Sequence, residues 1–125
     1  MMTEAQHQSA VFKWSRQPQI RQEYPELALM YHIPNEGKRS GRTANNLKQQ
    51  GLKSGVPDIC LPVARGGFSS LYIELKAEKG CVTPNQQWWI DTLRRFGCCV
   101  SLCYGWEEAT SLIHKYLDGE RAAEC

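Results

Sequence analysis

Apolar and polar residues alternate in the middle of the chain, which is the pattern of a half-buried strand. Every second residue of 71–76 is aliphatic, so the aliphatic side chains share one face of a strand and the polar ones share the other. A shorter apolar run covers 55–61, and the Gly66-Gly67 pair separates the two runs. Glycine pairs between strand-like runs are typical of turns, so we expect two short strands joined as a hairpin.

Helical spacing of apolar residues predicts helices over residues 3–15, 43–50, 84–96 and 106–117. Two of these helices have a clear start signal. Thr3 is followed three residues later by Gln6. Thr83 is followed by a proline and then by Gln86. A Thr cap with Gln at the third helical position forms a capping box, and proline is favoured at the first helical position. Gly97 provides the stop signal of the second helix.

The remaining segments complete an α/β pattern. Residues 16–26 contain two prolines, and we expect them to be irregular. Residues 27–33 and 98–104 are nearly continuous apolar runs of strand length, which is typical of strands covered on both faces. Strands interleaved with helices, with one pair of strands in a hairpin, predict a small mixed sheet flanked by helices. We expect residues 118–125 to fray.

Length and composition predict one globular domain over residues 1–125. A chain of 125 residues can form a single core, and 42% hydrophobic with 22% charged residues is ordinary for a soluble protein. The formal net charge of +2 at pH 7 gives no global sign of nucleic-acid binding, so any basic surface has to be local. No apolar run approaches the roughly 20 residues of a membrane span, so we expect no membrane partner.

Six cysteines raise the question of zinc or disulfides. Four of them fall inside apolar runs, one lies in a loop and one is the last residue, and no pair of Cys-x-x-Cys knuckles is present in the sequence. We therefore expect structural or incidental thiols ahead of a zinc site or disulfides. Such thiols suit a reducing cytoplasm, in a bacterial or phage-infected cell.

Two carboxylates and a lysine carry the candidate chemistry of the hairpin. Asp58 stands at the head of the first strand, and Glu74 and Lys76 share one face of the second. If the strands pair, these side chains converge at one end of the sheet, where two carboxylates can hold a hard divalent cation and a lysine can orient a water. A surface ion pair between Glu74 and Lys76 is the alternative. The apolar surroundings of both carboxylates favour the metal site, because unpaired charge is costly there.

A local basic excess precedes the first of these carboxylates. Residues 38–53 contain five cations and no acidic residue, namely Lys38, Arg39, Arg42, Lys48 and Lys53. Small polar residues separate several of these cations, which suits contacts with phosphates. A solvated charged face is the alternative.

In these motifs the sequence resembles the VRR-NUC (virus-type replication-repair nuclease) branch of the PD-(D/E)XK nucleases. The agreement covers roughly residues 3–117 and is far more specific than a Pro-Asp pair with a Glu-x-Lys triplet. The matching motifs are Glu4-x-x-x-Gln8, Ile33-Pro34-Asn35, Arg39, Lys48-x-x-Gly51, Gly55-Val56-Pro57-Asp58, Ile73-Glu74-Leu75-Lys76, Thr83-Pro84-x-Gln86-x-x-Trp89, Leu93-x-x-x-Gly97 and Gly105-x-Glu107-Glu108-Ala109.

This resemblance implies a fold and a reaction. The fold is the restriction-endonuclease-like αβββαβ core of the α/β class, and the reaction is hydrolysis of DNA phosphodiester bonds with Mg²⁺ or Mn²⁺. Asp58 and Glu74 then correspond to the metal carboxylates, and the backbone carbonyl of Leu75 to a further ligand. Lys76 corresponds to the residue that orients or deprotonates the attacking water. The cations of residues 38–53 would bind flanking phosphates.

Three further polar residues have two interpretations each. Gln86 matches a glutamine of the family's site, and its capping-box role explains it equally well. Glu4 matches the acid of the first helix, which could reach the metal through water, or it could only complement the helix dipole. Glu36 stands where relatives commonly have a small residue after Ile-Pro-Asn. We favour a salt bridge from Glu36 to Lys38 or Arg39 over a further metal ligand.

Members of the family of this size are similar to Holliday-junction resolvases, so the resemblance implies a homodimer that acts on branched DNA. Trp14, Trp88, Trp89 and Trp106 are candidates for a two-fold interface, although core packing is the commoner use of tryptophan. Two other functions stay open: a non-cleaving DNA-binding module of the same fold and a sequence-specific restriction-type nuclease. The intact catalytic set disfavours the first, and the lack of an insertion large enough for base readout disfavours the second.

Overall fold

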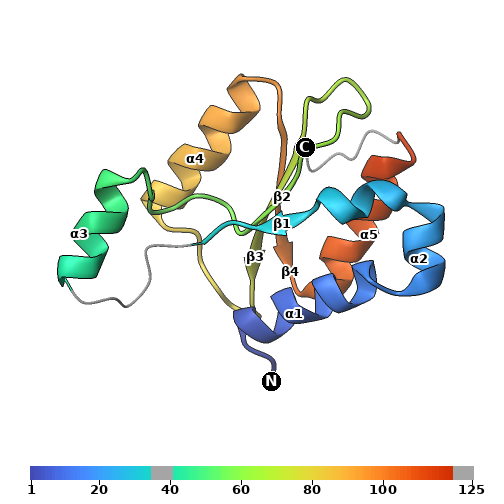
Figure 1. The fold of residues 1–125 in the computed structure, drawn as a ribbon, viewed down its shortest axis with the longest axis horizontal. Helices are drawn as coiled ribbons and strands as arrows, with labels where there is room; N and C mark the ends of the chain where they lie inside the picture. Colours follow the sequence, from blue (N-terminus) through green and yellow to red (C-terminus); the bar gives the residue numbers. More distant parts are fainter. Residues whose placement is uncertain (35–40, 120–125) are drawn as a thin grey trace.

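The computed structural model describes residues 1–34 and 41–119 (Figure 1). In chain order its elements are α1 (Glu4–Ser15), α2 (Pro18–Glu23), the 3₁₀ helix η1 (Pro25–Leu29), β1 (Tyr31–His32), α3 (Gly41–Gln49), β2 (Ile59–Leu61), β3 (Leu71–Lys76), α4 (Pro84–Arg95), β4 (Cys99–Tyr104) and α5 (Trp106–Leu117). None of the helices in these residues has both the length and the apolar character needed to cross a membrane.

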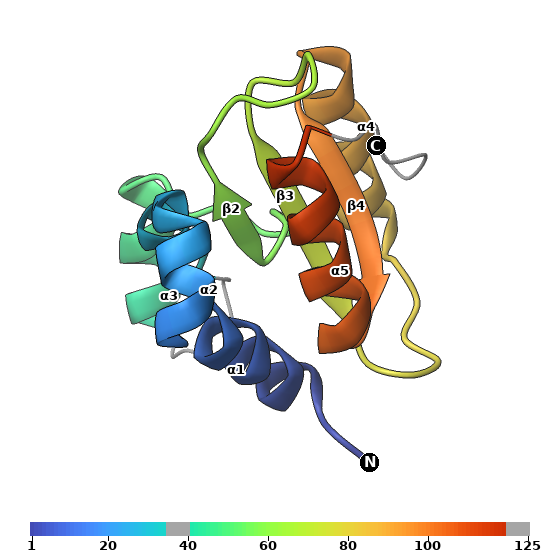
Figure 2. The ribbon, with the colours of Figure 1, turned by 90° about the vertical axis from the view of Figure 1, so that its right-hand side faces the viewer.

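The strands form one mixed sheet in the order β1-β2-β3-β4. β1 pairs with β2 and β2 with β3 in antiparallel fashion, whereas β3 and β4 are parallel. The parallel pair needs a crossover, and α4 supplies it. α4 lies on one face of the sheet, and α1 and α5 lie on the other (Figures 1 and 2). The predicted α/β class, with a small mixed sheet flanked by helices, is confirmed.

The core lies between the sheet and α1 and α5. Leu71, Ile73 and Leu75 of β3 are each 1% exposed, and they belong to one cluster with Val11 of α1 and Ile113 of α5. The alternation predicted from the sequence therefore holds, because every second side chain of β3 enters this core. The other side chains of β3 face α4, and this face carries the candidate chemistry.

Helix starts and stops follow the local sequence signals. Thr3 caps α1 and Thr83 caps α4, each with a complete capping box to the glutamine three residues later. Gly51 and Gly97 follow α3 and α4 with φ angles of +106° and +93°. In both places the next residue donates its N–H to a carbonyl five residues back, as in a Schellman motif. The four helices predicted from the sequence are confirmed, with ends that differ by a residue or two.

The segment between α1 and β2 differs from the prediction. Residues 16–26 were expected to be irregular, but Pro18 opens α2 and Pro25 opens η1, since proline is favoured at the first helical position. Residues 27–33 form a strand only at β1. Leu27 and Met30 are buried, whereas Tyr31 is 49% exposed, so this run is covered on one side only and the prediction of cover on both faces is wrong. The continuous apolar run reflects one helical turn followed by a short edge strand.

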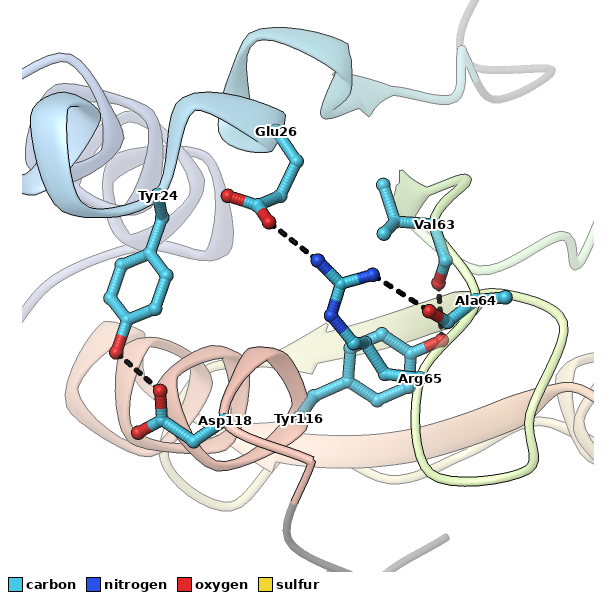
Figure 3. A network of polar contacts seen from close by, with 7 residues as sticks. All are labelled: Tyr24, Glu26, Val63, Ala64, Arg65, Tyr116 and Asp118. Carbon is cyan, nitrogen blue, oxygen red and sulfur yellow. Dashed lines mark hydrogen bonds and ion pairs between the residues drawn. The ribbon is translucent and has the colours of Figure 1, made fainter.

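The C-terminal end of α5 is tied to the N-terminal helices (Figure 3). The hydroxyl of Tyr24 donates a hydrogen bond to Oδ1 of Asp118 at 2.8 Å, and Nδ1 of His114 lies 3.2 Å from the same hydroxyl. The hydrogen bond to Asp118, together with burial, holds the pKa of Tyr24 far above its usual range, so the hydroxyl keeps its proton. Fraying from residue 118 onward was therefore a wrong prediction for Asp118, and residues 120–125 lie outside the described residues.

The long connection between β2 and β3 is anchored near the same place (Figure 3). Nη2 of Arg65 donates to Oε2 of Glu26 at 2.6 Å, and the hydroxyl of Tyr116 donates to the carbonyl of Val63. These contacts join the connection to η1 and α5. They fix the far end of the hairpin, opposite the end where β3 finishes.

The outer edge of β4 is protected by side chains of the flanking helices. The guanidinium of Arg94 donates two hydrogen bonds to the carbonyl of Val100, at 2.9 and 3.2 Å. A carboxylate oxygen of Glu108 accepts the N–H of Tyr104 at 3.0 Å. β4 is the last strand in the sheet order, so these side chains satisfy backbone groups that a further strand would otherwise use.

Gly55 is a packing constraint just before β2. Its φ is +83°, and a Cβ at this position would lie 2.8 Å from the side chain of Asn85 in α4. The Nδ2 group of Asn85 donates to the carbonyl and the hydroxyl oxygens of Ser54, at 3.0 and 2.8 Å. The close approach of this segment to α4 therefore requires glycine.

We predict that Gly55→Ala lowers the free energy of unfolding by about 2–3 kcal/mol, because a left-handed backbone and a steric clash both oppose the new methyl group. Gly51→Ala is the matched control, since Gly51 also has a positive φ but a Cβ there meets nothing within 4 Å. It should cost only about 1 kcal/mol. Urea unfolding of both variants measures the difference, and equal costs would contradict a packing role for Gly55.

Candidate active site

The register of the hairpin brings two carboxylates together. Ile59 pairs with Ile73, so one step along each strand places Asp58 opposite Glu74, with both side chains on the α4 face. The backbone N–H of Asp58 donates to the carbonyl of Ile73 at 2.9 Å. Its carboxylate oxygen Oδ2 accepts the N–H of Leu75 at 2.8 Å. Asp58 thus extends the pairing of β2 and β3 with its own side chain.

Glu74 is a buried acid with an unsatisfied oxygen. It is 1% exposed, and its Oε1 has no hydrogen-bond partner. Burial, the charge of Asp58 and a hydrogen bond shared with Asp58 together raise the pKa of Glu74 to about 9, against the opposing effect of the Lys76 charge. A carboxyl group held so far from its ordinary value, beside a second carboxyl group, is a poor structural ion pair and a good candidate for a functional site.

Lys76 is the third member of the site and is covered by the turn that follows β3. It is 6% exposed. A Cβ on Gly80 would lie 3.2 Å from Cδ of Lys76, so this turn rests directly on the lysine stem. The hydroxyl of Tyr104, the residue opposite Lys76 in β4, donates to the carbonyl of Gly80 at 3.1 Å. The aliphatic part of Lys76 is therefore enclosed.

The donor set fits a hard divalent cation. Asp58 and Glu74 offer carboxylate oxygens, including the buried Oε1 of Glu74 that has no other partner. The backbone carbonyl of Leu75 lies between Glu74 and Lys76 in β3. Within the described residues, no group of three His, Cys, Asp or Glu side chains is placed to hold a metal. Mg²⁺ is normally bound by one or two carboxylates, and water molecules fill its other coordination positions. The carboxylates of Asp58 and Glu74 fit this arrangement.

The comparisons with known proteins agree with this geometry. The sequence model of the VRR-NUC domain matches residues 3–107, most of the chain. The chain belongs to the VRR-NUC domain family. A solved structure described as a VRR_NUC domain protein matches with a TM-score of 0.79 and 29% sequence identity, over 96% of this chain and 92% of that chain. A search of curated proteins found no match. This VRR-NUC domain therefore has a nuclease-type fold.

Two other predicted site residues of the VRR-NUC domain lie at helix starts. Glu4, in the first turn of α1, is exposed, and its charge is close enough to add to the forces that raise the pKa of Glu74. Gln86 is half-buried at the start of α4, where its Oε1 accepts the N–H of Thr83 at 2.9 Å. The capping role of Gln86 is thus visible in the structure, and direct roles for Gln86 and Glu4 in catalysis stay predictions.

The structure describes the side chains of only some of the predicted phosphate-binding cations. Lys48 is exposed on α3, and Lys53 is exposed on the segment that leads to Asp58. Arg42 belongs to the first turn of α3, but its side chain is outside what the structure describes. Lys38, Arg39 and Glu36 lie outside the described residues, so neither the phosphate contacts nor the Glu36 salt bridge is tested.

Sequence reasoning missed the cover over Lys76. Gly80 and Tyr104 belong to a loop and to the end of β4, and neither had been assigned a part in the site. The available signal was the parallel pairing of β3 with β4, which sets Tyr104 beside Lys76, but this pairing cannot be read from either strand alone. Cys60, Cys81, Cys98 and Cys103 are free thiols, as predicted. Cys99 is disulfide-bonded, so the prediction of a thiol is wrong at that position.

We predict that Glu74→Gln stabilises the metal-free protein at alkaline pH. The folded-state pKa of about 9 lies above the ordinary 4.5, so the protonated carboxyl contributes its full stability below about pH 4.5 and loses it as the pH rises through about 9. In EDTA at pH 8 the variant should unfold about 5 °C above the wild type, and the gap should close toward pH 5. Circular dichroism melts measure this.

The exposed Glu78, just beyond β3, provides the control. Glu78→Gln should leave the melting temperature unchanged from pH 5 to pH 9. Added Mg²⁺ should raise the melting temperature of the wild type more than that of Glu74→Gln. A Glu74→Gln protein that melts below the wild type in EDTA at pH 8 would show that the Glu74 carboxylate is well satisfied without a cation.

Proposed function

We propose that this VRR-NUC domain is a DNA endonuclease that hydrolyses phosphodiester bonds with Mg²⁺ or Mn²⁺. One observation carries the proposal: the buried Glu74, whose Oε1 is unsatisfied, lies beside the half-buried Asp58 and on the same face of the sheet as the enclosed Lys76. Burial of one carboxyl group directly beside a second one is unfavourable unless a cation compensates for it. The family match supports a phosphodiester as the bond that is cut.

Asp58, Glu74, Leu75 and Lys76 have different roles in the proposed reaction. When bound, a divalent cation would supply positive charge for a phosphate oxygen and would make a nearby water more acidic. Asp58, Glu74 and the Leu75 carbonyl would hold this cation. Asp58 is kept in place by the Leu75 N–H, so its carboxylate is oriented before any substrate arrives. The amine of Lys76, on the same face, would orient the attacking water in line with the bond and take up its proton.

DNA would approach the α4 face of the sheet. Lys48 and Lys53 are exposed on the chain segment that leads into the site, and Lys38, Arg39 and Arg42 precede them in the sequence. Cations near the scissile bond position the backbone without reading sequence. This distribution favours binding by shape over binding by base sequence.

The substrate in our proposal is branched DNA, such as a Holliday junction, and the active form is a homodimer. A junction offers two symmetric strands, and a two-fold dimer presents two sites to them. Of the tryptophans, Trp88 is 57% exposed on α4, whereas Trp14 and Trp106 pack against the core. Trp88 is therefore the tryptophan that is available for an interface between copies.

Cleavage assays test the reaction. Labelled four-way junction, flap, duplex and single-stranded DNA are incubated with the protein in Mg²⁺, Mn²⁺ or EDTA. We expect cutting of the branched forms in either metal, none in EDTA, and a loss of about 100-fold or more in Asp58→Asn and Lys76→Met. Lys115→Met on the exposed side of α5 is the control and should cut like the wild type.

Each contrary result has a definite meaning. Cutting that survives EDTA or Asp58→Asn would end the metal-nuclease proposal. Tight binding to DNA without cutting in either metal would favour a non-cleaving module. Cutting of one duplex sequence in preference to all branched forms would favour a restriction-type nuclease.

We predict a dimer in solution. Light scattering at micromolar concentration should give about twice the chain mass, and Trp88→Glu should lower the mass toward that of a monomer, since a charge at an apolar contact opposes association. A monomer with and without junction DNA would contradict the dimer. Melting temperatures of the variant and the wild type show whether the fold is intact.

A further inference from the structure

A pocket lies next to the candidate active site on the same face of the sheet. Its volume is about 370 Å³, and its walls come from the β1 end, β3, α4 and the segment of residues 51–56. Three aromatic side chains, those of Tyr31, Tyr72 and Trp89, contribute to the lining, together with aliphatic residues such as Leu52 and Leu93. Lys53 is the cation among the lining residues. The pocket is thus aromatic and apolar, with one positive charge.

The walls of the pocket are held rigidly. The indole N–H of Trp89 donates to the carbonyl of Ser54 at 3.0 Å, and Asn85 donates to the same carbonyl and to the Ser54 hydroxyl. Gly55 allows this segment to pack against α4 without a clash. The loop wall and the α4 wall therefore keep their separation without a ligand, and a ligand would meet a pre-formed site.

The pocket is continuous with the carboxylate pair. Tyr72 precedes Glu74 by two residues and shares its face of β3, so the two side chains start about 7 Å apart along the strand. Ile33, another lining residue, donates its N–H to the carbonyl of Asp58 at 2.7 Å. A molecule bound at Asp58 and Glu74 therefore reaches the pocket within the length of one nucleotide.

We propose that this pocket receives an unstacked nucleobase of the DNA strand whose phosphate lies at Asp58 and Glu74. The inference rests on the proposed nuclease function. A base is the flat apolar part of DNA, and aromatic side chains bind bases through their π-faces with little dependence on sequence. Lys53 at the pocket complements the phosphate that accompanies the base.

The pocket then defines the substrate of the proposed nuclease. Bases inside a duplex are stacked on both sides and cannot enter a side pocket unless they are extruded, which costs free energy. An unpaired nucleotide at a branch point, gap or bubble enters without that cost. The substrate class is therefore DNA with an unpaired nucleotide next to the scissile phosphate.

Binding in EDTA tests this proposal separately from cutting. Three labelled DNAs of equal length are compared by fluorescence anisotropy: a perfect duplex, the same duplex with three unpaired central nucleotides, and the same bubble with those three nucleotides abasic. We expect the wild type to bind the normal bubble about 5- to 100-fold more tightly than the abasic bubble. The abasic bubble keeps the backbone and its flexibility, so the difference reports the bases.

Variants locate the effect. Tyr31 is 49% exposed, so Tyr31→Leu should fold normally and should lose most of the preference for the normal bubble. Tyr31→Phe keeps the ring and should retain the preference. Phe96→Leu, at the 72% exposed aromatic residue that follows α4, is the matched control outside the pocket and should also retain it.

The outcomes are distinct. Equal binding of the normal and abasic bubbles by the wild type, or an undiminished preference in Tyr31→Leu, would overturn the base pocket. A change of oligomeric state in Tyr31→Leu would overturn it as well, because the pocket would then hold part of a second copy. A preserved base preference without cutting in Mg²⁺ or Mn²⁺ would reject the nuclease function and support the base pocket. Cutting in Mg²⁺ or Mn²⁺ without a base preference would support the nuclease function and reject the base pocket.

Discussion

The register between β2 and β3 is the constraint on which the structure depends. The Asp58 carboxylate takes the place of a backbone acceptor for the Leu75 N–H, which locks the end of the hairpin. A slip of one residue would turn Glu74 and Lys76 toward α5 and would turn Ile73 and Leu75 away from the core. The hydrophobic core and the candidate site therefore depend on the same alignment. Neither can be altered without the other.

β3 carries a side chain that destabilises the fold on one face and a row of aliphatic side chains that stabilises it on the other. The buried Glu74 carboxyl, with its raised pKa, destabilises the metal-free protein at neutral pH. The aliphatic face of the same strand, fully covered by α1 and α5, stabilises it. The apolar packing on the core face therefore offsets the cost of burying Glu74 on the α4 face. Functional strain of this kind is common where a site has to be arranged before its ligand binds.

Local signals were enough to predict much of the fold. The capping boxes at Thr3 and Thr83 depend on residues three apart, and the alternation of β3 depends on residues two apart. Both kinds of pattern are visible in the sequence. The prediction failed for residues 16–33, where prolines that open helices look the same as prolines in loops and where a helical turn followed by an edge strand looks like a buried strand.

The candidate site was predictable only in part, because some of its residues are brought together by the packing of segments that are distant in the sequence. The predicted hairpin suggested that Asp58 and Glu74 would meet, because their strands follow one another in the sequence with no helix between them. The cover over Lys76 joins residues 76, 80 and 104, and the aromatic pocket joins β1, β3, α4 and a loop. Such groupings depend on how distant segments pack, and no short window of the sequence contains them. They required the three-dimensional structure.

The protected edge of β4 limits how this protein can assemble. Arg94 and Glu108 occupy the backbone groups of Val100 and Tyr104, so another strand cannot add there without displacing two charged side chains. The opposite edge is β1, only two residues long. A continuous sheet running through two copies is therefore disfavoured at both edges. An oligomer of folded copies is therefore expected to be joined through helices and loops.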